Sequence, residues 1–221
     1  MSHVPSLAVR LLTAKQGKTP LMFKRVLLRS MSTRQAASVV AQLSVDAFRE
    51  IALYESVERV ARLAAHLDPE TVRNAYLNMP DSFHLKLTRE LCSKQEFSAA
   101  AGFADLLTGM QLKVLFFAIN SVSHVVQVIK HMKNEFLVVE SIRNCSTSYL
   151  RQLTEEAVKL GDVDDSAHLL GMLPMQRQVD VCAKLSPAIL IPLMPQLLPI
   201  NDHELSRHLP PKLMDALFGA I

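Results

Sequence analysis

The stretch that decides the fold is LDPETVRNAYLNMP, residues 67–80. It opens on Leu-Asp-Pro and closes on Met-Pro. Both are an apolar residue followed closely by a proline. The Asp68 side chain can accept a hydrogen bond from the free amides of a helix's first turn. Pro69 suits the first helical position, because its missing N–H would have no partner there. Apolar residues at helical spacing follow, starting with Val72, and they form one stripe. The stretch therefore predicts a short capped helix and the start of the next.

The same unit recurs along the chain, as an apolar anchor followed by a small polar residue or proline. The anchors are Met31, Leu43, Leu67, Met79, Leu107, Ile119, Leu173, Leu185, Leu198 and Leu209. Where another unit is expected, Glu55-Ser56 keeps the polar cap but lacks the apolar anchor. A twelve-residue unit leaves roughly eight or nine helical residues, about 13 Å of helix. Helices that short are unstable alone, so they must stack on their neighbours as in a solenoid.

The period predicts an all-α fold, a superhelical stack of short helices. The twelve-residue period is interrupted between Met132 and Leu160. The apolar spacing there fits a longer helical pair, inserted near 132–160 and ending at Gly161. Residues 1–20 are predicted to form a basic N-terminal arm with a linker at its end. Residues 21–221 are predicted to form a single helical-repeat domain, with a possible sub-boundary near 132–162.

Composition agrees with a folded helical protein that lacks membrane spans. Of the 221 residues, 49% are hydrophobic and 20% are charged, which excludes a disordered chain. The longest uncharged runs, 114–129 and 185–201, are interrupted by polar residues or prolines, so neither predicts a membrane helix. The three cysteines, Cys92, Cys145 and Cys182, form no CxxC pair. Their scattered placement indicates buried thiols in a reducing compartment.

Charge is distributed unevenly, because no acidic residue precedes Asp46. This basic start has three interpretations: a mitochondrial transit peptide, a contact with phosphates of nucleic acid or an anionic membrane, or a solvated basic face. The candidate phosphate contacts are Lys24, Arg25, Arg29 and Arg34. The expected location is cytoplasmic, or the mitochondrial matrix if the start is a transit peptide.

Residues 67–80 resemble the paired short helices of the superhelical N-terminal domain in MgtE-type magnesium transporters, a fold shared by the middle domain of the flagellar switch protein FliG. In those families a Leu-Asp-Pro-Glu start and a Leu-Pro start recur about twelve residues apart. The likeness covers residues 25–130 and 165–220 as a pattern only. It implies a right-handed superhelix used for regulation or docking. It transfers no functional residue, since the motif encodes helix capping rather than chemistry.

No catalytic, metal or cofactor site is predicted, and the chain is not expected to be an enzyme. His203 and His208 are five residues apart, about 140° around a helix, so they cannot share a zinc ion on one helical face. Asp162, Asp164 and Asp165 fail the spacing of a calcium loop. They are expected instead to cap a helix that begins near Ser166.

The predicted function is a protein–protein interaction scaffold or regulatory adaptor. Its partner is expected to be another protein; the alternative is a nucleic acid or anionic membrane bound by the basic start, and a second alternative is an enzyme of unknown type. The segment 185–200 shows apolar residues on nearly every side. The candidate partner-binding residues there are Leu190, Ile191, Leu193, Met194 and Leu197. The other interpretation is a terminal repeat packed by Leu209, Leu213 and Phe218. The aromatic residues Phe48, Phe83, Phe116 and Phe117 are expected in the core.

Overall fold

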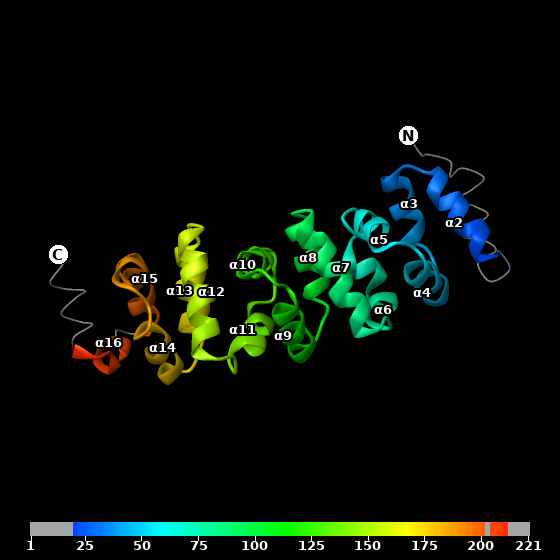
Figure 1. Cartoon of the computed structure of the whole chain (residues 1–221). Helices are drawn as coiled ribbons and strands as arrows, with labels where there is room; N and C mark the ends of the chain where they lie inside the picture. Colours follow the sequence, from blue (N-terminus) through cyan, green and yellow to red (C-terminus); the bar gives the residue numbers. More distant parts are fainter. Residues whose placement is uncertain (1–19, 202–203, 212–221) are drawn as a thin grey trace. The chain divides into compact units, whose positions relative to one another are not determined.

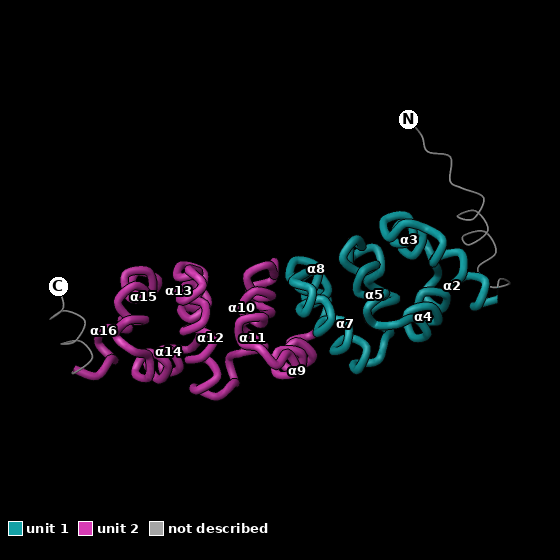
Figure 2. The backbone as a smooth tube through the Cα atoms, turned by 45° about the horizontal axis from the view of Figure 1, so that its top comes forward, with its two compact units in different colours: residues 1–107 teal, residues 108–221 magenta. Residues whose placement is uncertain are grey.

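The structure is a computed structural model that describes residues 20–201 and 204–211. Every regular element among these residues is a helix (Figure 1), which confirms the all-α prediction. The chain divides into two compact units, residues 1–107 and 108–221 (Figure 2), and each is described by itself. The sub-boundary predicted near 132–162 falls inside the second unit. The predicted arm, up to residue 19, lies outside the described residues.

Unit 1 is built from short helices in two layers. Its elements are α2 (Leu21–Ser30), α3 (Thr33–Val40), α4 (Val45–Tyr54), α5 (Val57–Ala64), the 3-10 helix η1 (Pro69–Val72), α6 (Arg73–Leu77), α7 (Asp81–Ser93) and α8 (Phe97–Ala104). Helix α4 packs on α2 and α6, whereas α5 packs on α3 and α7. Helices α2 to α7 thus pack on the helix two places along the chain, as the stacking of short helices requires, whereas α8 packs on α7 and η1.

Unit 2 follows a similar rule, with two longer helices, α12 of 13 residues and α15 of 14 residues. Its elements are α9 (Gly109–Ala118), α10 (Val122–His131), α11 (Glu135–Ile142), α12 (Thr147–Lys159), α13 (Val163–Gly171), α14 (Met175–Cys182), α15 (Pro187–Ile200) and α16 (Glu204–His208). Helix α9 packs on α11, α12 packs on both α10 and α14, and α13 packs on α15. Helix α12 also contacts α13 and α15, so it connects the helices of this unit.

The predicted helix caps are present at most unit starts. The residues whose side chains accept a hydrogen bond from a first-turn amide include Ser32, Ser44, Ser56, Asp68, Thr108 and Ser121. Ser32 and Thr108 also form capping boxes, with Gln35 and Gln111 returning a bond to the cap amide. These bonds satisfy donors that a helix cannot satisfy internally, which is why the polar residue after each anchor marks a helix start.

Two details of the predicted pattern are wrong. The inserted pair near 132–160 is not longer in both members, since α11 has eight residues and only α12 has 13. The period in fact continues there, with the caps Asn134 and Ser146 starting the two helices. Pro199 does not start a helix but lies inside α15. The three internal prolines of α15 are exposed, so the carbonyls that lose a partner can face water.

One arrangement of helices occurs in both units in the same register. Helices α7 and α12 both have 13 residues and begin 66 residues apart, at 81 and 147. Helices α8 and α13 begin at 97 and 163, again 66 residues apart. Between each pair lies a residue with positive φ, Gln95 at 60° and Gly161 at 84°. Residues 79–119 therefore correspond, position by position, to residues 145–185.

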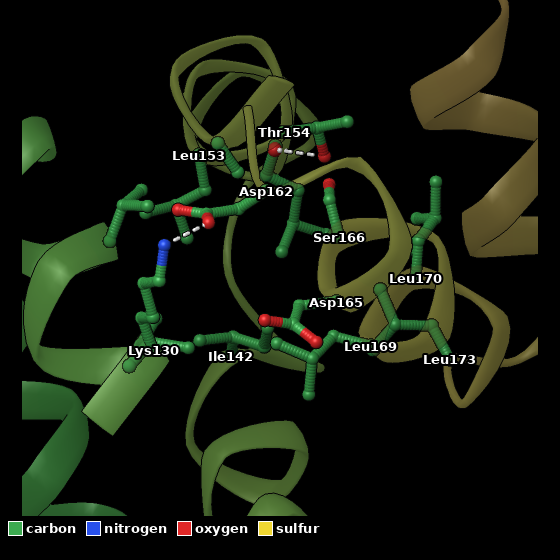
Figure 3. A pocket seen from close by; sticks show the side chains of 14 residues that line it. Lys130, Ile142, Leu153, Thr154, Asp162, Asp165, Ser166, Leu169, Leu170 and Leu173 are labelled. Carbon is green, nitrogen blue, oxygen red and sulfur yellow. Dashed lines mark hydrogen bonds and ion pairs between the residues drawn. The ribbon is translucent and has the colours of Figure 1, made fainter. Parts of the chain in front are cut away.

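The same register relates a cavity in each unit, although the two cavities are filled differently. Lining residues that correspond are Val60 and Val126, Leu63 and Ile129, Tyr76 and Ile142, Leu87 and Leu153, and Phe103 and Leu169. In unit 1 the buried rings of Tyr76 and Phe103 lie 5.0 Å apart and leave a space of about 30 Å³. In unit 2 aliphatic side chains take these positions and the pocket is about 60 Å³ (Figure 3).

Candidate functional site

Helix α9 presents apolar side chains on both of its faces. Its inner face is buried through Leu112, Leu115 and Phe116. Its outer face holds Met110, Val114 and Phe117, which are 72%, 49% and 51% exposed. These three residues are spaced i, i+4 and i+7, so they form one row along the helix. We call Met110, Val114 and Phe117 the α9 face. Phe117 was expected in the core, and that expectation is wrong.

The fold does not require apolar residues on this face. Helices α4, α9 and α14 each follow the polar or proline residue of a repeat unit, which is Ser44, Thr108 and Pro174 respectively. Counted from these residues, the positions of the α9 face hold Asp46, Glu50 and Leu53 in α4 and Gln176, Asp180 and Ala183 in α14. In α14 the side chain of Gln176 donates a hydrogen bond to Asp180 at 3.0 Å. The first two of these positions are therefore polar in both α4 and α14, whereas α9 has large apolar residues at all three.

The ring of Phe117 is held in place by a neighbouring helix. It lies 4.7 Å from the ring of Tyr149 near the start of α12, at an interplanar angle of 33°. Lys113 is the only charged residue of α9, so the face offers hydrophobic contact rather than ion pairing. A row of large, exposed and uncharged side chains is typical of a protein-docking surface.

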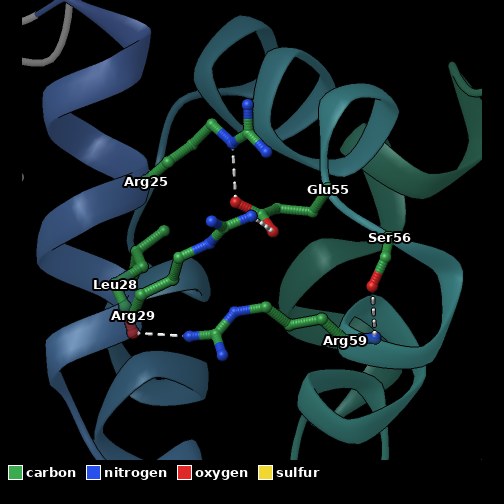
Figure 4. Close-up of polar contacts among 6 residues, drawn as sticks. All are labelled: Arg25, Leu28, Arg29, Glu55, Ser56 and Arg59. Carbon is green, nitrogen blue, oxygen red and sulfur yellow. Dashed lines mark hydrogen bonds and ion pairs between the residues drawn. The ribbon is translucent and has the colours of Figure 1, made fainter.

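Three of the four candidate phosphate contacts are paired with carboxylates inside unit 1. The Arg25 Nε and Arg29 Nη2 atoms donate to the two oxygens of Glu55 at 2.7 and 3.0 Å (Figure 4). Lys24 is buried and its Nζ lies 3.1 Å from Glu50 Oε2. Arg34 is exposed. Lys24, Arg25 and Arg29 are thus paired with acids some 26 to 30 residues further along, which charge counts along the sequence could not show.

Glu55 is a buried carboxylate, with 3% of its side chain exposed. Burial by itself raises its pKa, but the hydrogen bonds and charges of Arg25 and Arg29 outweigh burial and lower the pKa below the usual value of 4.5. The nearby Arg59 donates to the backbone oxygen of Leu28 at 2.7 Å. These contacts join α2 to the start of α5, so the cluster holds unit 1 together.

The candidate partner-binding residues of α15 lie mostly in the core. Leu190, Leu193, Met194 and Leu197 are at most 5% exposed, and only Ile191 is at the surface, at 49%. Their helix packs on α12, α13 and α16. The buried Leu205 and Leu209 follow directly, as in the alternative of a packed terminal repeat. Leu213 and Phe218 lie outside the described residues. The segment is apolar on many sides because several helices cover it.

The cysteines are buried thiols, as expected. Burial raises the pKa of Cys92 to about 11 and that of Cys182 to about 12, so the reactive thiolate is disfavoured at neutral pH. Among residues 20–201 and 204–211, no group of three His, Cys, Asp or Glu side chains is placed to hold a metal ion. Within the same ranges, no helix is both long and apolar enough to cross a membrane. His203 lies outside them.

Comparisons with known proteins give no match: no family model, no curated protein and no solved structure is similar to this chain. The resemblance of residues 67–80 to the MgtE and FliG domains therefore stays a prediction.

Proposed function

We propose that this chain is a non-catalytic interaction module that binds another protein through the α9 face. The observation that supports the proposal is the contrast between α9 and its two counterparts. Where α4 and α14 have polar residues, α9 exposes Met110 and Val114; at the third position α9 exposes Phe117, α14 has Ala183 and α4 has Leu53. Exposing large apolar side chains to water is unfavourable, by roughly 25 cal/mol per Å², and their burial in a complex would recover this energy.

The partner is expected to contribute an apolar surface, for example one side of an amphipathic helix. Such a helix presents residues at i, i+4 and i+7, which matches the spacing of the row on α9. Since α9 carries a single charge, from Lys113, binding should depend little on salt. A contact with nucleic acid through the basic start would instead weaken steeply between about 50 and 200 mM salt.

The test exchanges the α9 face for the residues that α14 has at the same positions. The variant Met110→Gln, Val114→Asp, Phe117→Ala should fold, because α14 accepts those residues in an equivalent place. A matched control is Met22→Gln, Val26→Asp on α2, where both wild-type residues are exposed, at 80% and 61%, and four residues apart. Affinity capture from an extract of the source cells is compared for the wild type and both variants, at low and high salt.

The proposal expects a specific protein that the wild type and the α2 control retain at high salt and that the α9 variant loses. It is overturned if all three chains capture the same proteins, or if capture depends on nucleic acid and disappears with salt. Sedimentation of the purified chain provides a further check. A dimer that the α9 variant abolishes would assign the face to a second copy of the chain and overturn the adaptor interpretation.

A further inference from the structure

The pocket of unit 2 is apolar inside and charged at its mouth. It lies between α10, α11, α12 and α13, and its interior is formed by side chains such as Ile142, Leu153, Leu169 and Leu173 (Figure 3). Its volume of about 60 Å³ exceeds the roughly 10–15 Å³ that a single water molecule needs. The side chains that line an empty apolar space lose van der Waals contacts on that side. It therefore favours an apolar guest over water.

The corresponding part of unit 1 shows that the fold can fill this space. There Tyr76, which is fully buried, and Phe103, at 1% exposure, replace Ile142 and Leu169. At a third position, Leu91 of unit 1 corresponds to the smaller Ala157, which lines the pocket. The pocket is thus a consequence of particular side chains and not of the backbone arrangement.

The mouth of the pocket has a net negative charge. Three charged residues line it: Lys130, Asp162 and Asp165. Lys130 Nζ donates to Asp162 Oδ1. The side chain of Asp162 is only 10% exposed, and its second oxygen, Oδ2, is buried without a hydrogen-bond partner among the described residues. A buried carboxylate oxygen without a donor is unfavourable, so this atom lacks a hydrogen-bond donor, and the net negative charge of the mouth favours a donor that is cationic.

We propose that the pocket binds a small aliphatic primary amine. Its ammonium group donates a hydrogen bond to Asp162 Oδ2 and lies near Asp165, while its short alkyl chain enters the space between Leu153, Leu169 and Leu173. The ammonium supplies the donor that Asp162 lacks and neutralises the excess negative charge of the mouth. A neutral ligand could donate to Oδ2 but would leave the net negative charge of Lys130, Asp162 and Asp165 uncompensated, and an anionic ligand would add to that charge. The α9 face contributes no lining residue, so this proposal does not depend on the proposed function.

The test uses three probes of nearly equal shape on the full-length chain: isoamylamine, isoamyl alcohol and isovalerate. Binding is followed by NMR of isotope-labelled leucine, isoleucine and valine methyl groups. With ligands of six or seven heavy atoms, we expect roughly millimolar affinity. The amine should bind about fivefold more tightly than the alcohol, as an additional part-exposed ion pair implies. Isovalerate should not bind. Equal affinity for amine and alcohol would overturn the proposal, as would amine shifts confined to methyl groups outside the pocket.

Two kinds of variant separate the charge from the space. Asp162→Asn should reduce amine affinity to that of the alcohol, whereas the matched control Asp164→Asn changes an exposed residue that does not line the pocket and should have no effect. Leu169→Phe introduces the residue of unit 1 and should abolish binding of both ligands. If that variant does not fold, Ala157→Leu serves the same purpose. Undiminished amine binding in Asp162→Asn, or in a folded pocket-filled variant, would contradict the assignment.

Discussion

Helices α7–α8 of unit 1 and α12–α13 of unit 2 share their register and a positive-φ turn, and α7 and α12 are equal in length, yet the interiors beside them differ. In unit 1 aromatic rings are packed together, with Tyr76 lying 5.0 Å from Phe103 and 4.4 Å from His84. In unit 2 the residues that correspond to Tyr76, Phe103 and His84 are Ile142, Leu169 and Leu150, and these smaller side chains line a pocket. The helical frame is therefore compatible with both a filled and an open interior. Exchanging a few side chains between the units should therefore change the packing of each interior while the helical frame stays the same.

The largest expected effect is the loss of an aromatic ring from unit 1. Phe103→Ala removes a side chain that is 1% exposed and should lower the free energy of unfolding by about 3–5 kcal/mol. Leu169→Ala, at the corresponding position, should cost about 1–2 kcal/mol, because Leu169 is only part-buried and already borders a pocket. Urea denaturation measures both losses, and hydrogen exchange assigns each to its unit. Equal losses would show that the two interiors are packed alike.

The fold could be predicted because its signals are local: helix caps and apolar spacing can be recognised within a few neighbouring residues. A cap such as Ser44 or Thr108 acts on amides three residues away, so its effect is visible in a short window. The anchor before α12 was missed because it is Cys145, which was counted among the buried thiols rather than among the repeat's apolar anchors. Cys145 is nevertheless 4% exposed and occupies the anchor position.

The functional features were harder to predict because they depend on contacts distant in sequence. Asp162 was expected to cap a helix, but its side chain makes no cap bond and instead pairs with Lys130, 32 residues earlier. The α9 face did have a signal: residues 109–118 are apolar on both sides, although each helix of a two-layer stack has one buried face. The same reasoning fails for α15, which packs on several helices. The sequence of a helix does not by itself show how many other helices pack against it.

A second comparison concerns the anchor positions Glu55 and Ile119, which precede α5 and α10. Ile119 is a buried apolar anchor, whereas Glu55 is a buried carboxylate held by Arg25 and Arg29. Glu55→Gln keeps the shape and removes the charge, so it should lower the free energy of unfolding at pH 7 by about 1–3 kcal/mol. Glu70→Gln, which affects an exposed pair with Arg73, is the control and should cost less than about 1 kcal/mol.

The Glu55 effect should also depend on pH, with a defined sign. The pKa of Glu55 is lower in the folded chain than its usual 4.5, so the unfolded chain binds the proton more readily. The stabilisation is therefore complete above pH 4.5 and is lost as the pH falls through the lowered folded pKa. Thermal midpoints of the wild type and Glu55→Gln should converge in that acidic range. A difference that stays constant down to the lowest pH would show that the charge of Glu55 contributes nothing.

The smallest expected effect concerns the two corresponding turns, one in each unit, that contain Gln95 and Gly161. Gln95 and Gly161 both have positive φ, 60° and 84°, a region that disfavours side chains other than glycine. A Cβ added to Gly161 would meet no atom within 4 Å, so Gly161→Ala should cost only the backbone strain, about 1 kcal/mol. Gln95→Gly should do the reverse and stabilise unit 1, by up to about 1 kcal/mol, because it relieves that strain while giving back some unfolded-state entropy.

Measuring the two turn variants together makes the comparison sharper than either alone. If the turns are equivalent, denaturation midpoints should move in opposite directions by similar amounts. Two shifts of the same sign would mean that the Gln95 side chain contributes a contact that outweighs its backbone strain. The equivalence of residues 79–119 and 145–185 would then hold for the helices but not for the turns between them. Because Gly161 directly precedes Asp162, Gly161→Ala would also be expected to displace the carboxylate and weaken amine binding in unit 2, whereas Gln95→Gly should leave that binding unchanged.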